Sequence, residues 1–167
     1  IRDFCLSRGL GEVYKRQFLH HGKLLYCIKS QHRKSAEENY EIFRDGLCAS
    51  KLFHKIMGDA DSYLNPKRMP ARLKWSEESH KRKYENDWVV DILPGNKSYD
   101  LGYDYYECGI CKLCQDEGCP KLAAYLCRMD YVLADIMHMK LVRTGTIAEG
   151  AAFCDFRYSK PRDEENS

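Results

Sequence analysis

The feature that most constrains the fold of this chain is a change in the spacing of its apolar residues. In residues 36–57 the apolar side chains recur every three or four positions, and Ser35 with Glu38 forms a capping box at the start. Further along, residues 87–93 and the aromatic-rich residues 99–107 have strand patterns on either side of the turn sequence PGNKS. We therefore expect one long helix and, after it, a hairpin of two strands.

The second half of the chain has the same kinds of pattern in the same order. The cysteine-containing stretch and residues 121–137 have helical spacing, broken near residues 118–120. Residues 140–148 and 152–159 then alternate as strands do, with Gly150 in the turn between them. This order predicts an α+β fold: N-terminal helices, then two β-hairpins forming an antiparallel sheet, with a cysteine-rich helical segment between the hairpins.

The chain of 167 residues has the length of one domain, which we place at residues 18–160. The opening residues 1–17, IRDFCLSRGLGEVYKRQ, resemble translated read-through of a sequencing adaptor, and we expect them not to be native. Residues 18–29 are then the remains of a first helix. Residues 67–83 hold seven Lys or Arg and are expected to form a solvated helix and a connector. Residues 161–167 are expected to be a charged tail.

Charge and cysteine content limit the partners and the compartment. Residues 1–17 hold four Lys or Arg and two Asp or Glu, so their net charge of +2 equals the formal net charge of the whole chain. Nucleic-acid binding is therefore disfavoured. No apolar run approaches the roughly 20 residues that span a bilayer. Nine cysteines, an odd number, favour a reducing, cytoplasmic setting. We expect a small-molecule substrate and neither a nucleic-acid nor a membrane partner, and we leave homo-oligomer formation open.

The cysteine run ECGICKLCQDEGCP, residues 107–120, allows several kinds of site. Its spacing, C-x2-C-x2-C-x4-C-P, differs by one residue from the C-x2-C-x2-C-x3-C-P of bacterial ferredoxins and occurs once. Zinc would need four thiolates, but its usual C-x2-C pairs are separated by a dozen or more residues. We therefore expect no cofactor, with zinc or an iron–sulfur cluster as the alternative. The ligands in that alternative are Cys108, Cys111, Cys114 and Cys119.

A third interpretation of the same run is a helix with thiols on more than one face. Cys108 and Cys111 are then one turn apart on the same face, and Cys114 lies further round. Cys108 is the most interesting of them, because it is where a strand gives way to a helix. The positive end of the helix dipole lowers the pKa of a thiol at such a position, as a nucleophile requires.

The C-terminal half resembles the L-2-amino-thiazoline-4-carboxylic acid hydrolase family. The resemblance is carried by the cysteine-containing segment, by the pattern CP.L…LC..D, and by the stretches VRTGTIAEG and CDFRY, and it extends over about residues 18–160. The closing EGAAFCDFRY is also similar to the end of four-vinyl-reductase-like ligand-binding domains, in which helices pack on an antiparallel sheet. That second likeness supports the fold and says little about activity.

The resemblance implies hydrolytic opening of a five-membered cyclic isothiourea that carries a carboxylate. Such chemistry needs an attacking thiolate or water, an acid for the departing nitrogen, and a cation for the carboxylate. Arg143 is the candidate cation, because a guanidinium binds a carboxylate through two hydrogen bonds. The candidate catalytic residues are Cys108, Asp130, Glu149 and Cys154. The candidate substrate-binding residues are Arg143, Thr144 and Asp155, and Asp155 is also a candidate proton carrier.

Each candidate also has a structural interpretation. Asp130 could cap a helix that begins at Tyr131. Strand alternation places Cys154 and Phe156 on one face, so Cys154 and Asp155 cannot both face one pocket. His138 is a weaker base candidate, because a lone histidine before a strand is more often exposed. The alternative function is a non-catalytic small-molecule or metal-binding sensor that uses the cysteine cluster.

Overall fold

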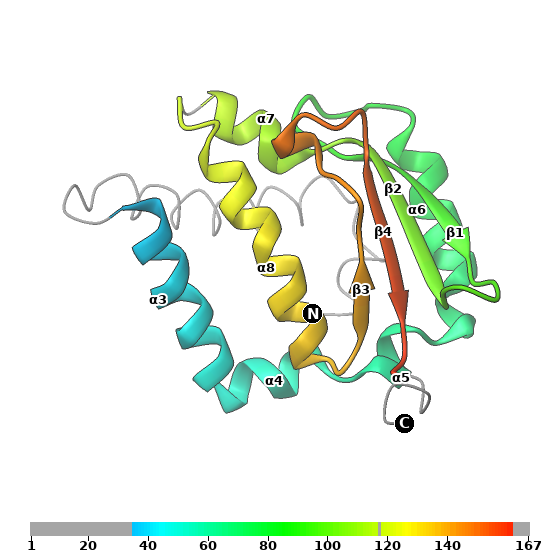
Figure 1. Cartoon of the computed structure of the whole chain (residues 1–167). Helices are drawn as coiled ribbons and strands as arrows, with labels where there is room; N and C mark the ends of the chain where they lie inside the picture. The colour runs from blue at the N-terminus through cyan, green and yellow to red at the C-terminus, as the bar shows by residue number, and fades with distance from the viewer. Residues whose placement is uncertain (1–34, 117, 162–167) are drawn as a thin grey trace.

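The computed structural model describes residues 35–116 and 118–161 (Figure 1). The helix expected at residues 18–29 and the opening residues 1–17 lie outside the described residues. No helix within the described ranges is long and apolar enough to cross a membrane.

The helix expected at residues 36–57 is two helices, α3 (Ala36–Ala49) and α4 (Lys51–Met57). The capping box at Ser35 is present, with the Ser35 hydroxyl accepting from the Glu38 N–H. The prediction of one uninterrupted helix is wrong at Ser50, whose backbone is extended at φ −83° and ψ 97°. The Ser50 hydroxyl accepts a hydrogen bond from the Phe53 N–H at 3.2 Å, so this serine begins a second helix.

The polar stretch that follows forms α5 (Ala60–Tyr63), the short 3₁₀ helix η1 (Pro66–Arg68) and α6 (Met69–Ser79). The helix is present as predicted, but one side of it is not solvated. Ser76 and Ser79 are buried against the first strand, where the Ser76 hydroxyl donates to the Val90 carbonyl at 2.8 Å. The Val90 N–H donates to the Ser79 hydroxyl at 3.1 Å. Helix α6 is therefore fixed to the sheet by polar contacts.

The four strands form one antiparallel sheet in the order β1-β2-β4-β3. The two predicted hairpins are confirmed, and the last strand of the chain pairs with β2 in the middle of the sheet (Figure 1). The α+β prediction is therefore correct. The strands are β1 (Val89–Pro94), β2 (Leu101–Glu107), β3 (Lys140–Val142) and β4 (Cys154–Ser159).

The second hairpin is shorter than predicted. Strand β3 ends at Val142 instead of residue 148, and the chain then forms the 3₁₀ helix η2 (Ile147–Glu149). Asp155 on β4 accepts the N–H groups of Thr144 and Gly145, at 2.8 and 3.1 Å, and so takes the place of ladder hydrogen bonds there. Gly150 ends η2 with φ +94°, a conformation that glycine adopts without strain.

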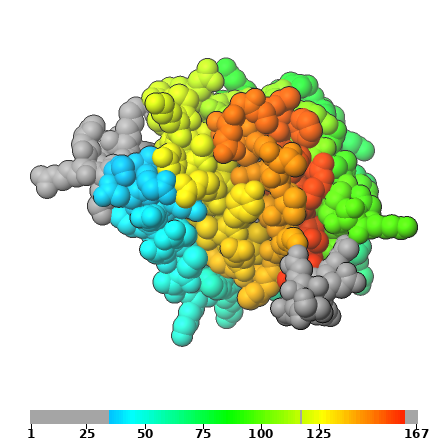
Figure 2. All heavy atoms as spheres, viewed as in Figure 1, coloured from blue at the N-terminus to red at the C-terminus, as the bar shows by residue number. Residues whose placement is uncertain are grey.

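The helical segment between the hairpins consists of α7 (Gly109–Asp116) and α8 (Leu122–Ile136), as predicted, with the break at residues 118–120. Helix α8 packs on the sheet with one side and on α3 with the other (Figure 1). In Figure 2 the segment between β3 and β4, in orange, lies beside α8, in yellow. Ala148 of that segment packs with Cys114 and Leu122.

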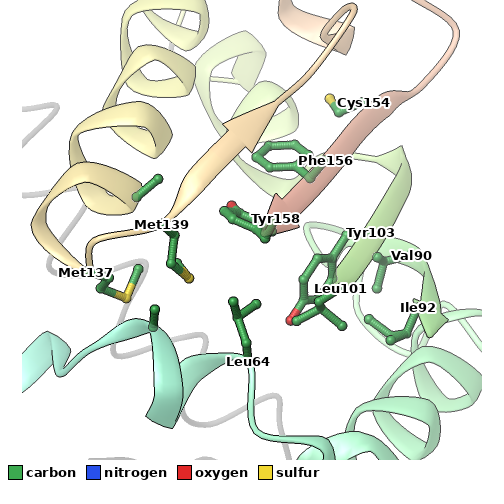
Figure 3. Packing of buried hydrophobic residues seen from close by; sticks show 12 residues of the cluster. Leu64, Val90, Ile92, Leu101, Tyr103, Met137, Met139, Cys154, Phe156 and Tyr158 are labelled. Atoms are coloured by element: carbon green, nitrogen blue, oxygen red, sulfur yellow. The ribbon is translucent and has the colours of Figure 1, made fainter. Parts of the chain in front are cut away.

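The main core lies between the inner face of the sheet and the helices. Figure 3 shows Cys154, Phe156 and Tyr158 in succession along β4, beside Tyr103 of β2. All four are buried, whereas Asp155 and Arg157, which alternate with them on β4, are partly exposed. This alternation means that one face of the sheet carries the core and the other is polar.

Candidate functional site

A cavity of about 410 Å³ lies between the inner face of the sheet and the helices that pack on it. This volume falls in the range of small-molecule sites, which are mostly apolar and carry a few polar groups. Most of the wall is aromatic or aliphatic. The aromatic lining residues are Tyr63, Trp75, Trp88, Tyr105, Phe156 and Tyr158. The thiols and the carboxyl group in the wall belong to Cys108, Cys127, Asp130 and Cys154.

Three elements bring these four groups to the same cavity. Cys108 is the residue between the end of β2 and the start of α7. Cys127 and Asp130 are three residues apart on α8, so both are on one face of that helix. Cys154 begins β4 and is paired in register with Tyr105 of β2. The predicted residues Cys108, Asp130 and Cys154 are thus together in the structure.

Cys108 has the lowered pKa of a reactive thiol. A hydrogen bond from the Cys111 thiol is the largest cause, and the N–H groups of Cys111 and Ile110 add to it. Burial and the nearby Asp130 act in the opposite direction, and the resulting pKa of Cys108 is about 7. The strand-to-helix junction was predicted to favour a thiolate, but the contribution of the Cys111 thiol was not anticipated.

The other two thiols of the cavity wall remain protonated near neutral pH. Burial raises the pKa of Cys127 and that of Cys154. The Ile147 N–H donates to the Cys154 sulfur at 3.2 Å, which lowers the pKa of Cys154 only in part. Of the two predicted nucleophiles, Cys108 is therefore the one that ionises readily.

Asp130 lies in the middle of α8, so the prediction that it caps a helix starting at Tyr131 is wrong. The reason is that the helix begins earlier, at Leu122, and passes through this position without a break. Burial raises the pKa of Asp130 to about 6, although Arg143 acts to lower it. The Asp130 side chain is 30% exposed and lines the cavity, so the carboxyl group can reach a bound molecule.

Arg143 is a buried partner of Asp130 and does not line the cavity. Its Nη1 donates to Asp130 Oδ2 at 3.0 Å, and its Nη2 donates to the Cys127 carbonyl at 3.2 Å. The guanidinium lies 4.9 Å from the ring centres of both Tyr131 and Phe156. Only 5% of the Arg143 side chain is exposed, and the guanidinium holds Asp130 in place. Its role in binding a substrate carboxylate stays a prediction.

Three other predicted residues do not line the cavity: Thr144 and Glu149 lie in the segment between β3 and β4, and Asp155 lies on β4. The Thr146 hydroxyl donates to Glu149 at 2.7 Å. The Thr144 hydroxyl donates to Asp155 at 2.8 Å. Burial acts to raise the pKa of Asp155, but hydrogen bonds from Thr144 and Gly145 outweigh it, and the pKa is lowered. These hydrogen bonds shape the segment between β3 and β4. His138 is exposed and also does not line the cavity.

The four cysteines of the run do not converge on one point. Cys108 and Cys111 interact at the start of α7, whereas Cys114 is fully buried in an apolar cluster and interacts with Cys119. Burial, the largest cause, raises the pKa of Cys114 to about 12. Among residues 35–116 and 118–161, no three His, Cys, Asp or Glu are arranged to hold a metal ion.

Comparison with protein families places this geometry in context. The family model described as L-2-amino-thiazoline-4-carboxylic acid hydrolase matches residues 16–158, which is most of the chain. The chain belongs to this hydrolase family. Searches of the curated proteins and of the solved structures gave no match.

In this member of the L-2-amino-thiazoline-4-carboxylic acid hydrolase family, the aromatic part of the cavity wall was not anticipated. Trp75 lies in the polar stretch that was interpreted as solvated, and its ring meets that of Tyr105 at 6.5 Å between centres. A tryptophan among charged residues on a helix is the signal that could have indicated a buried face there. Tyr63 and Trp88 had no comparable signal in the sequence.

Proposed function

We propose that the cavity binds a small cyclic isothiourea, such as 2-amino-thiazoline-4-carboxylate, and opens its ring by hydrolysis. The observation that carries this proposal is the Cys108 thiol, which lines the cavity with a pKa of about 7 next to the carboxyl group of Asp130. A thiolate that is accessible at neutral pH and lies beside a proton carrier is what nucleophilic catalysis requires.

In this proposal Cys108 attacks the amidine carbon of the ring. The new C–S bond gives a tetrahedral adduct, and the bond from that carbon to the ring nitrogen then breaks. Asp130 has a pKa of about 6, so it exchanges protons near neutral pH and supplies the proton that the departing nitrogen needs. Water then adds to the same carbon, one of its protons returns to Asp130, and Cys108 leaves as the thiolate. One water molecule is consumed and the enzyme is regenerated.

The charges of the cavity fit the amidine end of such a ring better than its carboxylate end. No Lys, Arg or His is among the described residues that line the cavity, and Arg143 is already engaged by Asp130. A basic amidine, in contrast, gains from a neighbouring carboxyl group and from aromatic faces. We therefore place the amidine against Cys108 and Asp130.

The test compares two rings and two variants. Purified protein is incubated with 2-amino-thiazoline-4-carboxylate and with the same ring lacking the carboxylate, and mass spectrometry follows the gain of one water. We expect turnover that is lost in Cys108→Ser and retained in Cys119→Ser, a matched control outside the cavity. The rate should be highest between pH 6 and 7, where Cys108 is partly ionised and Asp130 partly protonated.

The outcomes separate the proposal from its alternatives. Absence of turnover with both rings at high enzyme concentration would overturn it, and binding without turnover would favour the non-catalytic small-molecule sensor. Equal rates for the two rings would show that the carboxylate is not recognised. A strong preference for the carboxylate would instead point to a cation that the described cavity wall does not supply.

A further inference from the structure

Cys108 and Cys111 form a C-x-x-C pair at the start of α7, and the geometry points to a second property of this site. We propose that these two cysteines are a reversible dithiol–disulfide couple that exchanges with small disulfides through the cavity. This inference does not depend on the hydrolase activity, because it concerns only the two thiols and an oxidant.

The backbone geometry suits a disulfide between these two positions. Cys108 immediately precedes α7 and Cys111 is in its first turn, with the Lys112 N–H donating to the Cys108 carbonyl at 3.1 Å. Residues three apart on a helix are neighbours on one face, within the Cα separation that a disulfide needs. The Cys111 thiol already donates a hydrogen bond to the Cys108 sulfur.

Cys108 and Cys111 differ in whether a molecule in the cavity can reach them, which such a couple needs. Cys108 is buried from the outer surface but lines the cavity, so a small molecule inside the cavity can reach it, whereas Cys111 is partly exposed and does not line the cavity. Cys108 is therefore the attacking thiol and Cys111 the resolving thiol. The overlapping C-x-x-C formed by Cys111 and Cys114 lacks this asymmetry, because Cys114 is fully buried among apolar residues.

The exchange with a small disulfide RSSR balances in two steps. The Cys108 thiolate attacks one sulfur of RSSR, the S–S bond of the oxidant breaks, and RS⁻ leaves a mixed disulfide on Cys108. Cys111 then loses its proton and attacks the Cys108 sulfur as the thiolate, the mixed disulfide breaks, and the second R group leaves as RS⁻. The Cys111 proton passes to a leaving thiolate. Two electrons move from the protein to the oxidant, so one RSSR becomes two thiols.

Trypsin separates the two cysteine pairs onto different peptides, which makes a direct test feasible. Cleavage after Lys97, Lys112 and Lys121 gives residues 98–112, which hold only Cys108 and Cys111, and residues 113–121, which hold only Cys114 and Cys119. The full chain is equilibrated with mixtures of 2-mercaptoethanol and its disulfide and quenched with acid. Free thiols are alkylated with N-ethylmaleimide, the chain is digested with trypsin, and mass spectrometry gives the peptide masses.

We expect peptide 98–112 to lose two hydrogens and to escape alkylation at a disulfide-to-thiol ratio at least tenfold lower than peptide 113–121 requires. In Cys111→Ser the resolving thiol is absent, so a mercaptoethanol adduct should accumulate on Cys108. In the control Cys119→Ser, peptide 98–112 should oxidise as in the parent chain.

Three results would overturn the inference. In the first, peptide 98–112 stays fully alkylated while peptide 113–121 oxidises. In the second, Cys108 forms a disulfide with the peptide of Cys127 or Cys154. In the third, the Cys111→Ser variant gives no mercaptoethanol adduct on Cys108. If Cys108 is also the nucleophile of the proposed function, on which this expectation rests, oxidation of the Cys108–Cys111 pair abolishes ring opening. The peptide masses do not depend on turnover, so the two proposals fail separately.

Discussion

The two ends of α7 carry two pairs of cysteines in contrasting surroundings. Cys108 and Cys111 lie at the N-terminal end beside the cavity, where hydrogen bonds from a thiol and from N–H groups hold the pKa of Cys108 at about 7. Cys114 and Cys119 lie at the other end, where burial raises the pKa of Cys114 to about 12. The residue type is the same at both ends, so the reactive thiol is selected by hydrogen-bond donors and by access.

The contrast also explains why the run is not one cluster. A thiol that faces free N–H groups at a helix start is stabilised as the anion, whereas a thiol in an apolar cluster behaves as a small hydrophobe. Six residues separate Cys108 from Cys114, which is almost two turns of helix, so the two thiols are at different depths. The helix therefore divides the run into a chemical end and a packing end.

The largest expected effect is on catalysis and concerns the chemical end. Replacing Cys108 with Ser leaves a hydroxyl that does not ionise at neutral pH, so kcat/KM for ring opening should fall by on the order of 10³-fold or more. Replacing Cys119 with Ser should leave kcat/KM within about twofold. Steady-state kinetics by mass spectrometry checks both. Comparable losses in the two variants would mean that the two ends do not differ in function.

The next effect is on stability and concerns the packing end. Cys114→Ser places a hydroxyl in an apolar cluster where the thiol is fully buried, and should lower the free energy of unfolding by about 2 kcal/mol. Cys108→Ser should cost less, because its position borders a cavity. Urea unfolding followed by circular dichroism measures both values. The reverse order would contradict the assignment of Cys114 to packing.

The pH dependence of stability has opposite signs at Cys108 and at Cys114. The raised pKa of Cys114 contributes stability that is complete below pH 9 and is lost as the pH rises toward 12, by up to about 1.4 kcal/mol per pH unit. The lowered pKa of Cys108 contributes stability that is present above pH 9 and is lost as the pH falls through 7. Urea unfolding of Cys114→Ser at pH 8 and 10.5 should therefore show a smaller alkaline loss than the parent chain.

The fold was largely predictable from the sequence because the periods of its elements are local properties. One departure arises from a contact between residues some ten positions apart, and the other from a local helix cap. The early end of β3 depends on Asp155, which accepts N–H groups that a strand would have paired, and nothing in residues 143–148 indicates this. The break at Ser50 depends on whether one hydroxyl caps a helix, which spacing alone does not settle.

The candidate site was predictable only in part, because some of its residues are marked by local sequence and others are placed by packing. Cys108, Asp130 and Cys154 were found because a helix junction and a family resemblance pointed to them. Glu149 is close to Cys154 in sequence, but its carboxylate accepts from Thr146 within the loop. Trp75 is distant in sequence, and it reaches the cavity only because α6 packs on β1.

A smaller effect tests the cause of the contrast. In Cys111→Ala the largest stabilising hydrogen bond to the Cys108 thiolate is gone, so the pKa of Cys108 should rise from about 7 toward the ordinary thiol value of 9. The rate of iodoacetamide alkylation of peptide 98–112 against pH gives the midpoint. Cys111→Ser keeps a hydroxyl donor and should shift the midpoint less. An unchanged midpoint in Cys111→Ala would assign the lowered pKa to the helix N–H groups alone.

The smallest effect is expected at Cys119. Its thiol is partly exposed and interacts with Cys114, but its backbone supplies the structural contacts: its N–H donates to the Cys114 carbonyl at 2.8 Å, and its carbonyl accepts from the Leu122 N–H at 3.0 Å. Cys119→Ser keeps both and should change the free energy of unfolding by less than about 0.5 kcal/mol. A loss as large as that of Cys114→Ser, measured in the same urea experiment, would mean that the two thiols stabilise the helix break as a unit. The packing end would then owe its stability to a pair of sulfurs and not to the burial of one.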